Sequence, residues 1–155
     1  LWTNWTPRGA FALHPLQLNI AKRGAQLLAS GGRMVYSTCS MNPIEDEAVL
    51  AALLRWAGGG LRLVNPDGLL PALKRRKGVH HWPVVDGNFV RWDSATIALE
   101  TRAAIKEIKM PLTLWPPSKE EAEAMHLEYG MRIVPHDQDT GGFFIAILEK
   151  VGAVP

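Results

Sequence analysis

Cys39 is the residue of this sequence best suited to covalent chemistry. It is the single cysteine among 155 residues, so its thiol has no disulfide partner within the chain. It ends a segment of strand composition and precedes a segment of helix composition. A thiol just before a helix N-terminus lies near the positive end of the helix dipole, which favours the nucleophilic thiolate.

The neighbours of Cys39 are polar and would shape its surroundings. Thr38, Ser40 and Asn42 carry side chains that can form hydrogen bonds. The acidic residues 45–47 would oppose a thiolate if they pointed toward the sulfur. A structural role is the alternative, because unpaired cysteines are among the most often buried residues. Position alone leaves both roles open.

The elements that position Cys39 follow from the spacing of apolar residues. Intervals of three and four predict a helix over about 14–29, after an irregular stretch over 1–12; the positions are Leu13, Leu16, Ile20, Gly24 and Leu27. Pro15 suits the first turn of this helix. Gly31-Gly32 would end it, and residues 33–39 have strand composition. This order predicts the αβ step of a parallel α/β fold.

A second helix is expected over about 43–57. Asn42 is a good N-cap, and Glu45 stands three positions later, as in a capping box. The acidic residues 45–47 would lie at the positive end of the helix dipole. A run of glycines at 58–60 would end the helix, and residues 61–64 form a short strand.

The remaining sequence is less regular. Residues 65–117 are expected to form loops, with short strands near 79–92. Ser118 to Glu121 reads as a capping box that opens a helix over about 119–129. Residues 132–135 suit a short edge strand because Pro135 limits pairing. Residues 143–148 form an apolar closing strand.

The amino-acid composition limits the classes of function that this chain could have. Hydrophobic residues make up 47% of the chain and charged residues 21%, as in one ordinary globular domain. No apolar run approaches the roughly 20 residues of a membrane helix. A single cysteine excludes a cysteine-rich zinc site, and no metal site is expected. The net charge is only +2, so nucleic-acid binding would depend on a local patch.

Residues 31–47 read GGRMVYSTCSMNPIEDE. This string closely resembles a signature of the Sun-family RNA (cytosine-5) methyltransferases: Gly-Gly, a strand ending Tyr-Ser-Thr-Cys-Ser, then proline and an acidic cluster that opens a helix. Residues 125–128, 132–136 and 140–146 resemble that family's closing segment. Thr140-Gly-Gly-Phe-Phe144 resembles the eukaryotic branch that modifies many tRNA sites. The resemblance covers nearly the whole chain and is weakest over 65–117.

The resemblance implies a mechanism. The cysteine of Thr-Cys-Ser is the family's nucleophile, which here is Cys39, with Thr38 and Ser40 shaping its loop. The thiolate would add to C6 of a cytosine so that C5 can take a methyl group from S-adenosylmethionine. The target base must leave its stack. Thr-Cys, where DNA cytosine methyltransferases have Pro-Cys, favours RNA, with tRNA as the expected substrate.

The resemblance also implies an incomplete domain. The expected fold is α/β: the second half of a Rossmann-like S-adenosylmethionine-dependent methyltransferase sheet with an antiparallel C-terminal strand. Residues 1–155 would be the C-terminal part of one catalytic domain, made of a helix–strand block (14–64), an irregular insertion (65–117) and a helix with the closing strand (118–150). The glycine-rich cofactor loop would precede Leu1, so no cofactor-binding residue is expected here. The chain alone would be inactive, with an unpaired sheet edge.

One basic run is the candidate for RNA phosphate, and it consists of Lys74, Arg75, Arg76 and Lys77. A solvated surface loop is the alternative. The rival function is a non-catalytic RNA-binding or protein-interaction module in which Cys39 is structural. A lone cysteine fits a reducing compartment, and the resemblance implies the nucleus or nucleolus, with no membrane partner.

Overall fold

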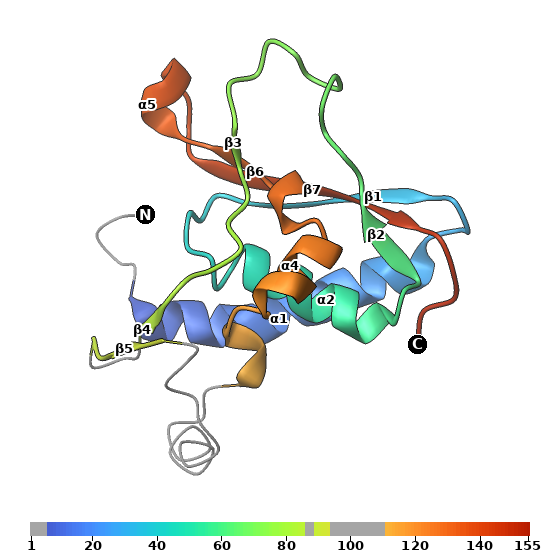
Figure 1. Ribbon diagram of the computed structural model, residues 1–155, viewed down its shortest axis with the longest axis horizontal. Helices are drawn as coiled ribbons and strands as arrows, with labels where there is room; N and C mark the ends of the chain where they lie inside the picture. Colours follow the sequence, from blue (N-terminus) through green and yellow to red (C-terminus); the bar gives the residue numbers. More distant parts are fainter. Residues whose placement is uncertain (1–5, 86–88, 94–110) are drawn as a thin grey trace.

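A computed structural model describes residues 6–85, 89–93 and 111–155. Its main sheet has five strands, in the order β1-β7-β6-β3, with β2 also paired to β7. Figure 1 shows helices α1 and α2 together on one side of this sheet. The loop that carries Cys39 connects the sheet to this helical layer.

Helix α1 spans Pro7–Leu27 and begins earlier than expected. The interpretation of residues 1–12 as irregular was wrong for the described part, because Thr6 is an N-cap that accepts a 3.1 Å hydrogen bond from the Gly9 amide. Pro7 takes the first turn, so Pro15 lies inside the helix. The apolar stripe is exposed at Leu13, Leu16, Ile20 and Leu27, whereas the buried side consists of Ala10, His14, Leu18, Ala21 and Ala25.

Strand β1, Arg33–Thr38, follows the Gly-Gly turn as expected. Gly31 has φ 74°, a left-handed conformation that favours glycine. The closing strand β7, Phe143–Lys150, is antiparallel to β1, which confirms the expected antiparallel C-terminal strand. Strand β2, Leu61–Leu63, pairs with the other edge of β7. Strands β1 and β2 therefore run parallel to each other with β7 between them.

Helix α2 spans Glu47–Ala57 and begins later than expected. Asn42 does not cap it: its side-chain oxygen accepts a 3.3 Å bond from the Ile44 amide, and residues 43–46 form turns. The Glu45 carbonyl accepts a 2.6 Å bond from the Tyr36 hydroxyl, so it is held by the sheet rather than by a helical amide. The helix ends at Gly58, which adopts a left-handed conformation as the C-cap.

The insertion contributes to the sheet, which the sequence did not predict. Strand β3, Arg76–Lys77, pairs with β6, Met131–Ile133. Since β6 also pairs with β7, the expected edge position of residues 132–135 was wrong. Strands β4, Val84–Val85, and β5, Arg91–Trp92, form a separate small sheet, as expected for 79–92. Residues 86–88 and 94–110 of the insertion lie outside the described residues.

Short helices complete the C-terminal part. Helix α4 spans Lys119–Ala124, with Ser118 accepting from the Glu121 amide as predicted. The expected extent to 129 was wrong, because His126 has φ 55° and interrupts the helix. A 3-10 turn, η3, covers Leu127–Tyr129, and another, η2, covers Leu112–Leu114. Helix α5 covers Pro135–Gln138, so Pro135 begins a helix.

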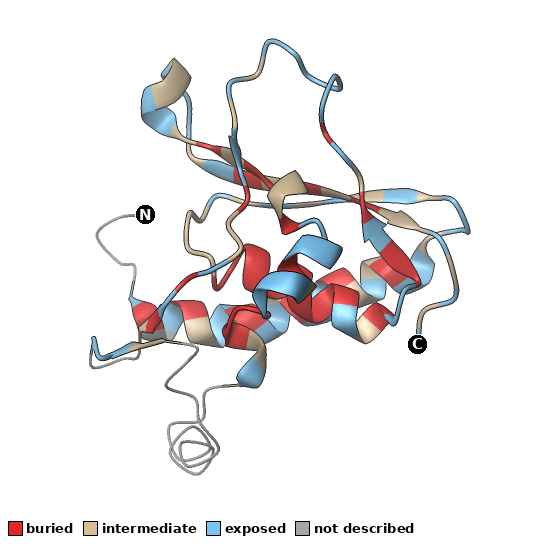
Figure 2. Ribbon diagram, in the orientation of Figure 1, coloured by how far each residue is buried: buried red, intermediate tan, exposed pale blue. Residues whose placement is uncertain are grey.

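The core lies between α2 and the sheet, where Figure 2 shows buried residues in red on the ribbon. Leu50, Leu53, Phe144 and Leu148 are fully buried there. Each such side chain contributes roughly 1.5–3 kcal/mol through removal from water. Among the described residues, no helix has the length and apolarity needed to cross a bilayer.

Candidate active site

Cys39 directly follows the last residue of β1 and is exposed. It therefore lies at the carboxyl end of a strand, where open α/β sheets bind their ligands. An exposed thiol is accessible to a substrate, whereas a structural cysteine is usually buried. The structure thus places the predicted nucleophile at an accessible end of the sheet.

Side chains of the loop itself hold residues 38–42 in place. Thr38 Oγ1 accepts a 2.9 Å hydrogen bond from the Ser40 amide. Ser40 Oγ accepts a 3.1 Å bond from the Asn42 amide and donates a 2.9 Å bond to Glu45 Oε1. Such bonds from short polar side chains to nearby amides are typical of tight turns. The three polar neighbours of Cys39 thus fix the loop that carries the thiol.

The acidic residues after the loop are buried rather than exposed. Glu45 is 5% exposed, and Asp46 and Glu47 are fully buried. The turn before them is anchored by His14, whose Nδ1 lies 2.7 Å from the Ile44 carbonyl oxygen. Burial lowers the pKa of His14, which favours a neutral ring that donates to this carbonyl. The acidic cluster is therefore part of the support beneath the loop.

Arg132 is the cation that forms ion pairs with this acidic cluster. Its Nε donates to Glu47 Oε1 at 2.7 Å, and its Nη2 donates to Glu47 Oε2. Its Nη1 donates to the Met41 carbonyl oxygen at 3.0 Å. Glu47 Oε1 also accepts a 2.9 Å bond from the Val79 amide. The role of Arg132 was not predicted from the sequence, where its one signal was a charged residue within the apolar strand Met131–Ile133.

Asp46 lies beside this ion pair without a hydrogen bond to either carboxyl oxygen. Arg132 Nη2 is 3.4 Å from Asp46 Oδ2, but its donors are directed to Glu47 and Met41. Burial, followed by the negative charge of Glu47, raises the pKa of Asp46 to about 9, and Arg132 only partly offsets this. Burial outweighs the ion contact, so the Asp46 carboxyl is neutral at pH 7.

The sheet register connects the loop with the basic run. Thr38 and Arg132 both pair with Phe144, from opposite edges of β7. Arg132 in turn pairs with Arg76. Three strand spacings separate Thr38 from Arg76, which is roughly 14 Å. The basic run and the thiol therefore lie on one line across the sheet.

Two cations of the basic run are engaged within the protein. Arg75 Nη2 donates to the Pro66 carbonyl oxygen at 3.0 Å and to Asp67 Oδ1 at 3.1 Å. Arg76 forms a two-point contact with Asp137, at 2.9 and 2.8 Å. The Lys74 amide donates to Gln138 Oε1 at 2.9 Å. The structure thus divides the run into two paired arginines and two exposed lysines, Lys74 and Lys77.

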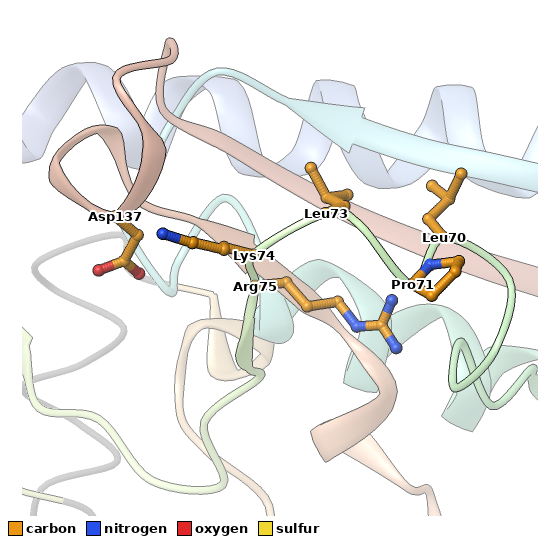
Figure 3. A pocket seen from close by; sticks show the side chains of 6 residues that line it. All are labelled: Leu70, Pro71, Leu73, Lys74, Arg75 and Asp137. Atoms are coloured by element: carbon orange, nitrogen blue, oxygen red, sulfur yellow. The ribbon is translucent and has the colours of Figure 1, made fainter.

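An open hollow of about 570 Å³ lies beside the basic run. It is lined by Leu70, Pro71, Leu73, Lys74, Arg75 and Asp137. Figure 3 shows the Lys74 side chain extending toward Asp137, while Arg75 extends toward Pro71. The hollow is a basic and apolar surface rather than an enclosed pocket.

Within the described ranges, no group of three His, Cys, Asp or Glu side chains is arranged to hold a metal ion. His80 and His126 instead each contact Glu128, at 3.0 Å. The His80 contact attaches the segment before β4 to the 3-10 turn η3, whereas the His126 contact is local to that turn.

Known proteins that are similar to this chain carry the names of RNA methyltransferases. A family model described as 16S rRNA methyltransferase RsmB/F matches residues 2–66. A multisite-specific tRNA:(cytosine-C(5))-methyltransferase of Schizosaccharomyces pombe is 44% identical over 99% of this chain. The corresponding enzyme of Saccharomyces cerevisiae is 46% identical over 97%. A tRNA (cytosine(34)-C(5))-methyltransferase of Drosophila melanogaster is 43% identical over 97%.

The chain spans about a fifth of the length of these relatives, 22% of the first and 20% of the other two. A crystal structure of a methyltransferase homolog from Pyrococcus horikoshii matches 94% of this chain and 33% of its own, with a TM-score of 0.58 and 20% identity. This likeness confirms the expected α/β fold, with a Rossmann-like arrangement of helices and sheet.

Proposed function

We propose that this chain belongs to the Sun family of RNA (cytosine-5) methyltransferases and that its protein methylates C5 of cytosine in RNA, with tRNA as the substrate. A family model that matches residues 2–66 and relatives that match nearly the whole chain support the proposal. The observation that carries the proposal is an exposed Cys39 at the carboxyl end of β1, on a loop fixed by its own side chains. Relatives with tRNA (cytosine-5) names, 43–46% identical, support the choice of substrate.

The proposed chemistry begins at the Cys39 sulfur. The thiolate forms a bond to C6 of the cytosine, and the electron pair of the C5–C6 double bond moves to C5. That pair would form the bond from C5 to the methyl group, while the bond between the methyl group and the sulfonium sulfur of the donor breaks and S-adenosylhomocysteine leaves. Loss of the C5 proton then frees the C5–H bonding pair to re-form the C5–C6 double bond, which expels the thiolate from C6 and leaves 5-methylcytosine. A covalent intermediate divides one difficult step into two easier ones.

Thr38 and Ser40 act on this reaction through the loop, because they fix its amides. S-adenosylmethionine, when bound, supplies the methyl group. We assign the methyl donor to none of the described residues. We further propose that the chain is the C-terminal part of one catalytic domain and is inactive alone.

The rival function is a non-catalytic RNA-binding or interaction module with a structural Cys39. That role is typical of a buried thiol. Cys39 is exposed. Within the described structure, its sulfur forms no hydrogen bond that would hold the side chain in place. The exposed thiol therefore favours catalysis. We further propose, from the resemblance, that this activity takes place in the nucleus or nucleolus.

Covalent trapping tests the proposal. The full-length protein is incubated with S-adenosylmethionine and tRNA that carries 5-azacytidine, whose nitrogen at position 5 prevents release of the enzyme. A denaturing gel should show an RNA-linked band for the wild type and none for Cys39→Ala. A band that persists in the variant would assign the attack to another cysteine. Absence of a band in both proteins, with RNA binding intact, would favour the module.

A further inference from the structure

After Thr38, whose backbone belongs to β1, residues 39–42 of the loop that carries Cys39 have one long-range hydrogen bond among the described residues. The internal bonds of the loop join residues at most five positions apart. The bond from Arg132 Nη1 to the Met41 carbonyl oxygen, by contrast, spans 91 positions. Met41 is two residues after Cys39. The bond to Met41 therefore fixes the loop relative to the sheet, which the internal bonds cannot do.

Arg132 is itself held rigidly. Its strand, β6, pairs with β3 on one side and β7 on the other, so its backbone cannot shift alone. The guanidinium carbon lies 5.6 Å from the ring centroid of the buried Phe144, a distance typical of a cation–π contact. The Arg132 side chain is 11% exposed. Its position is thus set by two strands, an aromatic ring and a carboxylate.

Glu47 directs the guanidinium. Both of its oxygens accept bonds from Arg132, and this two-point geometry fixes the plane of the guanidinium. Nη1 then points at the Met41 carbonyl. Glu47 is the first residue of α2, so one ion pair connects the helix, the sheet and the loop. A lysine could not make all three contacts, because an ammonium lacks the planar fork.

We infer that Arg132, oriented by Glu47, is a positioning residue that holds the Cys39 loop in its reactive geometry. The inference rests on the proposed methyltransferase function and deepens it. Arg132 does not touch the reacting atoms. It acts by keeping the carbonyl of Met41, and with it the turn that follows the thiol, at a fixed place relative to β1. A misplacement of about 1 Å at such a site can slow a reaction by about 100-fold.

Arg132→Lys is the test variant, in the full-length protein. Hydrogen exchange measured by mass spectrometry reports on the loop without any need for activity. We expect amides of residues 38–42 to exchange at least about fivefold faster, with β7 unchanged. The second readout is the single-turnover rate of adduct formation at saturating 5-azacytidine tRNA. We expect this rate to fall about 10–100-fold, with the Kd for RNA within about twofold of wild type.

Arg55→Lys is the matched control. Arg55 also makes a two-point contact with a glutamate, Glu121, at 2.6 Å from both Nε and Nη2. It lies on α2 but contacts nothing in the loop. Its adduct rate and loop exchange should equal those of wild type. If Arg132→Lys fails to fold, Glu47→Gln/Arg132→Gln takes its place, since it removes both charges together and keeps an oxygen for the Val79 amide.

The outcomes separate the inference from the proposed function. Faster loop exchange with a slower adduct rate and unchanged RNA affinity supports the positioning role. Unchanged loop exchange, or an adduct rate within about twofold of wild type, overturns it. If wild type itself forms no adduct, the proposed function fails, while the exchange comparison still decides whether Arg132 fixes the loop.

Discussion

Ser40 Oγ donates a 2.9 Å hydrogen bond to Glu45 Oε1 and thereby joins the residue after Cys39 to the turn that leads into α2. The same oxygen accepts from the Asn42 amide. Glu45 is nearly fully buried, so its carboxylate has little access to water. The hydroxyl therefore satisfies a buried acceptor and a loop amide at once.

Ser40→Ala should destabilise the loop. The substitution leaves Glu45 Oε1 and the Asn42 amide without this partner, which costs about 1–3 kcal/mol of folding free energy. We expect adduct formation with 5-azacytidine RNA to slow by about tenfold, because the thiol is on the same loop. Ser37→Ala, at an exposed position of β1, is the control and should change neither quantity. Equal adduct rates for both variants would refute the role of Ser40.

The burial of the Asp46 carboxyl predicts how the free energy of unfolding depends on pH. Burial raises its pKa from 3.8 to about 9 in the folded state, so folding favours its neutral form. The neutral Asp46 carboxyl contributes fully to stability below pH 3.8. This contribution falls as the pH rises and is lost above about pH 9. Asp46→Asn removes this titration. The free energy of unfolding in urea, followed by tryptophan fluorescence, should therefore decline less between pH 5 and 9 in the variant.

Asp46→Asn suits this comparison because neither Asp46 oxygen has a hydrogen bond to lose. Asp67→Asn is the control, since Asp67 is 80% exposed and its substitution should leave the pH dependence as in wild type. Parallel pH profiles for wild type and Asp46→Asn would show that the Asp46 carboxyl is ionised in the folded protein.

Gly130→Ala should overpack the region behind Arg132. A Cβ at this position would lie 2.8 Å from Phe144 Cζ and 2.9 Å from Cε2, and Phe144 is fully buried. Forcing such a contact costs about 1–3 kcal/mol. Gly152→Ala, whose Cβ would meet its nearest atom at an ordinary 3.5 Å, should be nearly neutral. Urea titration of both variants makes the comparison, and equal stabilities would contradict the packing described here.

The sequence predicted the elements whose signals are local. The strand before Cys39, the Gly-Gly turn and the Ser118 cap were all predicted correctly, because each depends on neighbouring residues. The start of α2 was missed because Tyr36, a residue of β1, binds the Glu45 carbonyl. That contact depends on tertiary structure, which overrides a capping pattern.

The motif predicts Cys39 as the nucleophile. The residues that hold its loop in place could not be predicted. Arg132 and Glu47 are 85 positions apart, and nothing in their local sequences indicates a pair. Strand β3 was missed for a similar reason: a basic run has little strand propensity. It joins the sheet because β6 offers an open edge and Asp137 accepts the Arg76 side chain.

The basic run gives the last prediction, which concerns RNA binding. Lys74 and Lys77 are exposed, whereas both arginines of the run contact acidic side chains. If the lysines contact RNA phosphates, Lys74→Gln/Lys77→Gln should weaken tRNA binding. Each lost phosphate contact reduces the slope of log Kobs against log salt concentration by about 0.7–0.9. The double variant should therefore lower this slope by roughly 1.4–1.8 in filter-binding titrations.

Arg75→Gln separates this effect from damage to the loop. Arg75 holds Pro66 and Asp67, with a side chain only 17% exposed, so its loss should loosen the loop and leave the salt slope nearly unchanged. A lower slope in the lysine variant alone would place RNA phosphate at Lys74 and Lys77, on either side of Arg75 and Arg76, and the backbone of Arg76 lies roughly 14 Å across the sheet from Thr38. An unchanged slope in the lysine variant would make the run a solvated surface loop, and the RNA would then reach Cys39 over another part of the protein.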